Sequence, residues 1–172
     1  MSKTSVLFLC THNSARSQMA EGLLRHLGGE KYEVYSAGST PTHVNPLAIK
    51  VMAEIGVDIS GQRSKNIDEY RGKDFDVVVS VCRSSPSVKC AFCSSPLIGG
   101  RPEIINEVLP EAKRYIDHGF ADPSDVVGSD EEKLTTFRRT RDDIKKWILD
   151  SFVDIGTEDS ASAGHQQKPS KS

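Results

Sequence analysis

The chain has 172 residues, of which 37% are hydrophobic and 27% are charged, and its formal net charge is −2 at pH 7. This length suits one domain with a substantial core. The small negative charge gives no general attraction to nucleic acid or to anionic membranes, so neither is an expected partner, and any anion site must be built locally.

Strands and helices alternate along the first half of the chain. The apolar run over residues 6–9 predicts a strand buried on both faces, and a helix with one apolar face follows from about residue 17 to 27. A second strand is predicted over 32–37. Asn45 and Pro46 then open a helix that ends at Gly56, because asparagine caps helices and proline suits their first position.

The second half repeats the pattern with one long interruption. Residues 75–81 hold four valines and predict a third buried strand. Residues 83 to about 111 are rich in Ser, Pro and Gly, and loops of this length are usually functional or mobile. Ser129 and Glu132 have the spacing of a capping box that opens a last helix. The alternation predicts an α/β fold with an open parallel sheet.

The C-terminal segment sets the expected end of the domain, and the cysteines together with the lack of long apolar stretches indicate where the protein is located. Beyond Gly156 no apolar residue is larger than alanine, so we expect one domain over residues 1–153 and a disordered tail over 154–172. No stretch suits a signal peptide or a membrane span, which favours the cytoplasm. Because that compartment keeps thiols reduced, the four cysteines predict buried hydrophobes, metal ligands or redox chemistry rather than structural disulfides.

The loop CTHNSARS joins the first strand to the first helix and has the composition of an oxyanion site. Its backbone N–H groups can form a nest for a tetrahedral anion, at the positive end of the helix that follows. Arg16 offers a planar fork for two anion oxygens. Cys10 faces this positive field, which favours its nucleophilic thiolate form. The predicted anion-binding residues after Cys10 are Thr11, His12, Asn13, Ser14, Ala15, Arg16 and Ser17.

Cys82 directly follows the third predicted strand, as Cys10 follows the first. Ligands of open parallel sheets bind at the carboxyl ends of the strands. We therefore expect both cysteines at the same edge of the sheet.

The segments CTHNSARSQMAEGLLRHL, YEVYSAGS, HVNPLAIKVMAEIGVDISGQRSK and FDVVVSVC resemble the low-molecular-weight tyrosine phosphatase family. Within it, the chain is most similar to the thioredoxin-coupled arsenate reductases. This resemblance implies an open four-stranded parallel sheet flanked by helices, a monomer, and reduction of arsenate to arsenite as arsenic detoxification. The alternative is hydrolysis of phosphotyrosine through a phosphoenzyme on Cys10.

The family carries an Asp-Pro pair late in the chain, which is Asp122-Pro123 in this sequence. A thiolate attack on an oxyanion expels an oxygen that leaves more easily when it is protonated. The resemblance therefore implies that Asp122 is the proton donor.

The other cysteines distinguish reduction from hydrolysis, because a phosphatase needs only one. The resemblance implies that Cys82 attacks the arsenic adduct on Cys10, and that Cys90 then moves the disulfide to the surface for thioredoxin. Glutaredoxin or a mycothiol-type reductant is the alternative donor. Cys93 is an alternative resolving thiol, since the spacing from Cys82 to Cys90 is one residue longer than usual. Residues 94–113 form an apparent insertion in the family pattern.

No cofactor or metal is predicted, and zinc and potassium are the alternatives. Zinc could be held by Cys82, Cys90 and Cys93 with His118, but the chain has no second C-x2-C pair. Some reductases of this family hold potassium beside the anion loop. Of the residues that would match that site, Asn13, Glu21 and Ser36 are present, but Lys65 replaces the carboxylate, and its ammonium group can take the place of the ion.

Overall fold

The computed structural model describes residues 2–83 and 110–152. A four-stranded sheet is its centre, with the strand order β2-β1-β3-β4 and every neighbouring pair parallel. The described elements, in chain order, are β1 (Thr4–Cys10), α1 (Arg16–Gly28), β2 (Tyr32–Gly38), α2 (Pro46–Ala53), η1 (Ile67–Tyr70), β3 (Phe75–Cys82), β4 (Ala112–Phe120), η3 (Pro123–Asp125) and α3 (Asp130–Ser151). The predicted α/β fold with an open, parallel, four-stranded sheet is confirmed.

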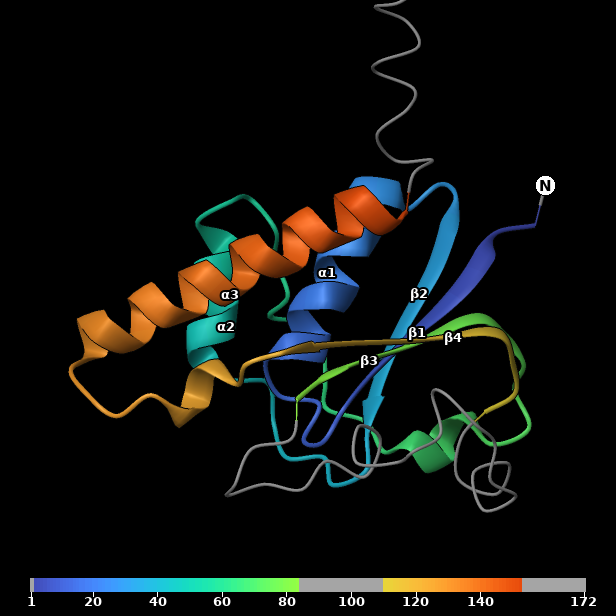
Figure 1. Ribbon diagram of the computed structural model, residues 1–172, viewed down its shortest axis with the longest axis horizontal. Coiled ribbons are helices and arrows are strands. Elements are labelled where there is room, and N and C mark those ends of the chain that lie inside the picture. Colours follow the sequence, from blue (N-terminus) through green and yellow to red (C-terminus); the bar gives the residue numbers. More distant parts are fainter. Residues whose placement is uncertain (1, 84–109, 153–172) are drawn as a thin grey trace, which may run out of the picture.

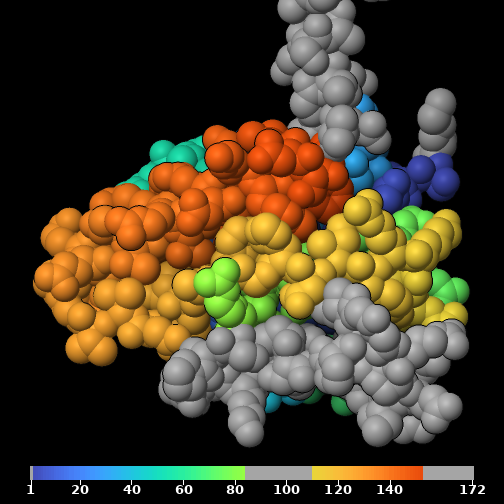
Figure 2. All heavy atoms as spheres, viewed as in Figure 1, coloured from blue at the N-terminus to red at the C-terminus, as the bar shows by residue number. Residues whose placement is uncertain are grey.

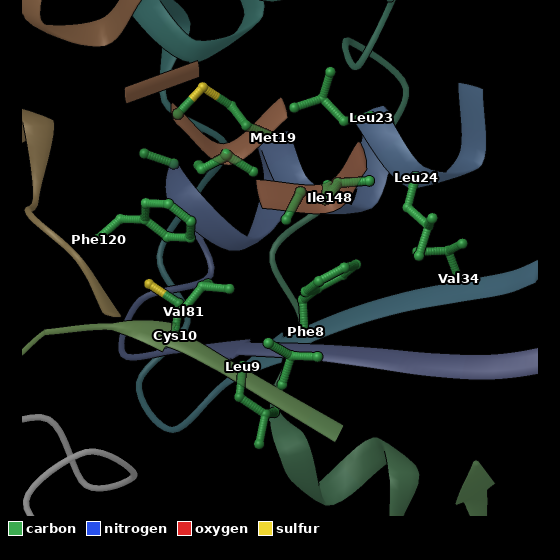
Figure 3. Close-up of a cluster of buried hydrophobic side chains, with 14 of the residues drawn as sticks. Phe8, Leu9, Cys10, Met19, Leu23, Leu24, Val34, Val81, Phe120 and Ile148 are labelled. Atoms are coloured by element: carbon green, nitrogen blue, oxygen red, sulfur yellow. The ribbon is translucent and has the colours of Figure 1, made fainter. Parts of the chain in front are cut away.

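Helices α1, α2 and α3 gather on one face of the sheet, and the short helix η1 lies against the other (Figure 1). Alternation along β1 divides its side chains between these faces. Phe8 and Cys10 point toward α1, whereas Leu9 points toward η1 (Figure 3). All three are nearly inaccessible to solvent. β1 is therefore buried on both faces, as its continuous apolar run predicts.

The helix boundaries follow from local hydrogen bonds. The Asn45 side chain accepts from the Leu47 amide at 2.9 Å at the start of α2, and the Ser129 hydroxyl accepts from the Glu132 amide at 3.3 Å at the start of α3. Gly56 follows α2 with a φ of 78°, a value that glycine adopts without steric cost. Both predicted capping signals are confirmed.

Strand β4 was not predicted. The sequence predicts a loop up to about residue 111 and no strand after it. Its residues, AKRYIDHGF, are largely exposed because β4 is an edge strand. The apparent insertion over 94–113 therefore ends inside β4. The side chains of β4 and α3 meet on the face shown in Figure 2. Between these two elements, the ring of His118 stacks on that of Trp147 with centroids 4.9 Å apart.

Within residues 2–83 and 110–152, no helix has both the length and the apolar character that crossing a membrane requires.

Candidate active site

A pocket of about 170 Å³ opens at the carboxyl ends of the strands, where the loop after β1 turns into α1. It brings together the two ends of the predicted site, the loop that follows β1 and the Asp122 segment that follows β4. Its lining residues are Cys10, His12, Ser14, Ala15, Arg16, Thr42, His43, Asp122 and Ser124. Three of these, Thr42, His43 and Ser124, were not predicted from the sequence.

The backbone carbonyls of the anion loop are bonded to neighbouring segments. The segment after β2 donates to three of them: Thr40 to Thr11 at 2.9 Å, Thr42 to His12 at 3.2 Å, and Asn45 to Ser14 at 2.9 Å. In a trans peptide the carbonyl and the following N–H point in opposite directions. Because these carbonyls point out of the loop, the N–H groups of the residues that follow them point into it, as an anion nest requires.

Asn13 holds the turn of this loop in shape. It adopts the left-handed conformation, with a φ of 48°, and its side chain is fully buried. Its amide group donates to the hydroxyls of Ser17 and Ser36, at 2.8 and 2.9 Å. Its side-chain oxygen accepts from the Lys65 amide and from Gln18, both at 2.9 Å. Asn13 and Ser17 therefore act behind the pocket wall, where they order the loop.

Arg16 is buried, with 4% of its surface exposed, and each terminal nitrogen has a partner. Nη1 donates to the Phe120 carbonyl at 3.0 Å, and Nη2 forms an ion pair with Asp122 at 3.1 Å. The Nε–H group is buried and has no hydrogen-bond partner among the described residues. Leaving a buried donor unpaired costs about 1–3 kcal/mol, and an anion in the pocket would remove that cost.

Asp122 is oriented from both sides of its carboxylate. One oxygen meets Arg16, and the other accepts from the Ser124 amide at 3.0 Å and from the Ser124 hydroxyl at 2.6 Å. The structure therefore places the predicted proton donor in the wall of the same pocket as Cys10.

Cys82 lies at the edge where Cys10 lies, at the end of the neighbouring strand. The pairing of Leu9 with Ser80 places Cys10 beside Val81, and alternation then turns Cys82 to the opposite face of the sheet. Cys82 is disulfide-bonded, whereas Cys10 is a buried free thiol. The other predicted relay cysteines, Cys90 and Cys93, lie outside the described residues.

Lys65 occupies a buried position next to the anion loop. Its ammonium group is 3.5 Å from a carboxylate oxygen of Glu21, and that oxygen also accepts from the Ser36 hydroxyl. Burial lowers the pKa of Lys65, and the Glu21 carboxylate opposes this shift. Together with Asn13, which bonds Ser36, these residues form a chain of contacts that ends at the anion loop.

We expect Lys65→Ala to weaken the binding of inorganic phosphate about tenfold, the equivalent of ~1.4 kcal/mol. The substitution removes the buried cation beside Glu21, which keeps only its ion pair with the half-exposed Arg25, and loosens the Ser36–Asn13 contact. High concentrations of potassium or ammonium should restore part of the affinity, because a small cation can enter the vacated space. Titration calorimetry measures the effect, with Lys73→Ala as the matched control, since Lys73 contacts Tyr35 instead. Unchanged phosphate affinity in Lys65→Ala would show that Lys65 does not support the anion loop through Glu21, Ser36 and Asn13.

No three histidine, cysteine or acidic side chains in the described part of the chain are grouped to hold a metal ion. His118, the proposed fourth zinc ligand, lies on β4 against Trp147. The zinc alternative itself depends on Cys90 and Cys93 and remains a hypothesis.

Comparison with known proteins places this site in context. The model of the low molecular weight phosphotyrosine protein phosphatase family matches residues 5–160. An arsenate reductase of Halalkalibacterium halodurans is 40% identical over 156 residues, which are 91% of this chain and 99% of the relative.

Solved structures of arsenate reductases are also similar to this chain. An arsenate reductase in its phosphate-binding state superposes with a TM-score of 0.64 at 33% identity, covering 89% of this chain and 99% of the other. The thioredoxin-dependent arsenate reductase of Corynebacterium glutamicum superposes with a TM-score of 0.58 at 27% identity, covering 91% of this chain and 63% of the other.

Proposed function

The chain belongs to the low molecular weight phosphotyrosine protein phosphatase family, and we propose that within this family it is an arsenate reductase. The observation that carries this function is the state of the two cysteines at the sheet edge. Cys82 is disulfide-bonded while Cys10 is a free thiol. That is the state expected after two electrons have reached the substrate and the disulfide has moved away from the anion loop.

The reaction begins with arsenate in the pocket formed by the anion loop. Arg16 and the inward N–H groups bind its oxygens, and the Cys10 thiolate attacks arsenic. An oxygen leaves as water when Asp122 supplies a proton, and the product is a covalent As(V) adduct on Cys10.

The second stage is reduction. Once the end of β3 turns the reduced Cys82 side chain to the face of Cys10, its thiolate attacks the Cys10 sulfur of the adduct, so that a Cys10–Cys82 disulfide forms and the sulfur–arsenic bond breaks. The electron pair of that bond stays on arsenic, which leaves as As(III) in arsenite. Cys90, or Cys93 in its place, then attacks the Cys82 sulfur and releases Cys10 as a thiolate.

Thioredoxin is the proposed reductant that returns the last disulfide to two thiols. A relative of this chain is described as thioredoxin-dependent, which supports the choice. Because such a relay needs a reducing thiol pool, we place the enzyme in the cytoplasm. The monomeric state is proposed from the family resemblance alone.

Hydrolysis of phosphotyrosine is the competing function, since Cys10, Arg16 and Asp122 would suffice for it. The pocket argues against it: its described lining contains no phenylalanine, tyrosine or tryptophan that would hold a phenyl ring. The imidazoles of His12 and His43 and the hydroxyls of Thr42 and Ser124 suit a small, fully polar anion better.

Mass mapping of disulfides after one turnover tests the proposal. The fully reduced protein is mixed with one equivalent of arsenate, quenched with acid and digested. Trypsin isolates Cys10 and Cys82 in separate peptides, over residues 4–16 and 74–83, and chymotryptic cleavage after Phe92 separates Cys90 from Cys93. We expect one equivalent of arsenite and one disulfide that contains Cys82. Four free thiols with no arsenite, together with rapid hydrolysis of phosphotyrosine peptides, would favour the phosphatase.

A further inference from the structure

Ser80 places a hydroxyl group inside the most apolar strand of the sheet. It lies between Val79 and Val81, both fully buried, and only 4% of its own surface is exposed. Burying a hydroxyl without a hydrogen bond costs about 1–3 kcal/mol on mutational scales. This hydroxyl therefore needs a hydrogen-bond partner inside the protein.

That partner is the sulfur of Cys82. Ser80 Oγ lies 3.6 Å from Cys82 Sγ, both side chains are buried, and both project from the same face of β3. A disulfide sulfur carries no hydrogen, and Cys82 is disulfide-bonded. Ser80 must therefore be the donor and Cys82 the acceptor. A thiolate at Cys82 carries a full negative charge and is a stronger acceptor for the same hydroxyl than a disulfide sulfur.

The ladder between β3 and β4 is irregular where this contact forms, because two residue steps on β3, Ser80 to Cys82, face three on β4, Asp117 to Phe120. The register between β3 and β4 shifts between Ser80 and Cys82. Gly119 on β4 allows the close approach, because a Cβ atom there would lie 2.9 Å from the Cys82 carbonyl oxygen. The extra residue belongs to β4, so β4 bends there, whereas β3 keeps the alternation that puts Ser80 and Cys82 on one face.

We propose that Ser80 is a catalytic residue of the thiol relay, whose hydroxyl donates a hydrogen bond to the Cys82 sulfur and stabilises its thiolate. The role of that thiolate in turnover rests on the proposed arsenate reductase function. The hydroxyl is needed because Cys82 is 1% exposed, and a charge that is taken out of water must find a partner in the protein.

The hydroxyl acts at two steps. In the first, the Cys82 thiolate attacks the Cys10 sulfur, and Ser80 raises the fraction of Cys82 that is ionised. In the second, a reductant thiolate attacks the other sulfur of the Cys82 disulfide, a new disulfide forms, and Cys82 leaves with the electron pair of the broken bond. A stabilised thiolate leaves faster.

Alkylation of the reduced, full-length protein by iodoacetamide across a pH series tests the proposal. In this reaction the Cys82 thiolate displaces iodide, and the tryptic peptide 74–83 reports on Cys82 alone. We expect Ser80→Ala to move the pH midpoint of Cys82 alkylation up by about one unit. Because nucleophilicity rises as the thiol becomes more basic, the rate at pH 7 should fall only about three- to fourfold.

Two controls make the result specific. Ser80→Thr keeps a hydroxyl and should restore the wild-type midpoint. The peptide 4–16 reports on Cys10 in the same digest and should not change if the sheet edge is intact. The charged groups next to this strand end are Asp117, which pairs with Ser80 and has a pKa raised by burial, and Arg83, which follows Cys82. Ser80→Ala alters neither.

The outcomes separate this inference from the proposed function. An unchanged Cys82 midpoint in Ser80→Ala, or an equal shift at Cys10, would overturn the role of Ser80 even in an enzyme that reduces arsenate. Because alkylation needs no arsenate, a chain that made no arsenite would still show the Cys82-specific shift if Ser80 stabilises the thiolate.

Discussion

Replacing Cys82 with serine is expected to abolish multiple-turnover arsenite formation, with a fall in the thioredoxin-coupled rate of roughly a thousand-fold or more. The substitution removes the nucleophile that cleaves the sulfur–arsenic bond, and a serine hydroxyl cannot form a disulfide. Cys10, Arg16 and Asp122 are untouched, so the covalent adduct on Cys10 should still form. NADPH consumption through thioredoxin reductase measures turnover, and mass spectrometry of the intact protein detects the adduct.

The matched controls are Cys90→Ser and Cys93→Ser. Whichever of these residues is the resolving thiol should, when replaced, leave one equivalent of arsenite and a trapped Cys10–Cys82 disulfide. Replacement of the other should leave turnover close to wild type. Free small thiols must be absent from the assay, because they could resolve the adduct in place of Cys82. Full turnover of Cys82→Ser with thioredoxin alone would show that the relay does not pass through Cys82.

The sequence predicted best those features that depend on a few neighbouring residues. The apolar runs of β1 and β3 are buried strands because both faces of the sheet centre are covered, and Asn45 and Ser129 cap helices through bonds to amides two and three residues away. Strand β4 escaped prediction because an edge strand needs no continuous apolar run. Its partner β3 supplies the hydrogen bonds, and polar side chains remain in water.

The sequence predicted individual residues of the site, but it did not predict how the fold brings them together. The anion loop and Asp122 could be recognised locally, whereas Thr42 and His43 reach the pocket through backbone bonds between the segment after β2 and the anion loop. Strand register is equally non-local. One strand cannot show that Cys82 faces away from Cys10, and only the pairing of Leu9 with Ser80 does so. The signal available for Thr42 and His43 was their position just after a parallel strand, at the ligand-binding edge.

Arg16→Lys is expected to lower turnover about 100- to 1,000-fold and to weaken inhibition by inorganic phosphate at least tenfold. Lysine keeps the positive charge but offers one ammonium group where the guanidinium has three nitrogens at fixed angles. Two of those nitrogens bond Phe120 and Asp122, and the third, Nε, is the buried donor without a partner among the described residues. The variant therefore loses both the anion contact and the link between the anion loop and the Asp122 segment. Wild-type phosphate inhibition in Arg16→Lys would show that the fork does not bind the anion.

Asp122→Asn is the matched comparison, because it separates binding from proton transfer. The asparagine side chain has a single acceptor oxygen, so it can keep the contact with Arg16 or the bond from the Ser124 amide but not both, and it cannot act as an acid. With that oxygen turned to Arg16, phosphate inhibition should stay within about twofold of wild type, while formation of the Cys10 adduct slows by roughly 100-fold or more. If Asp122→Asn instead weakened phosphate binding as much as Arg16→Lys does, the main work of the carboxylate would be to position Arg16. Together the two variants show how much the Arg16–Asp122 pair contributes to substrate binding and how much Asp122 contributes as a proton donor.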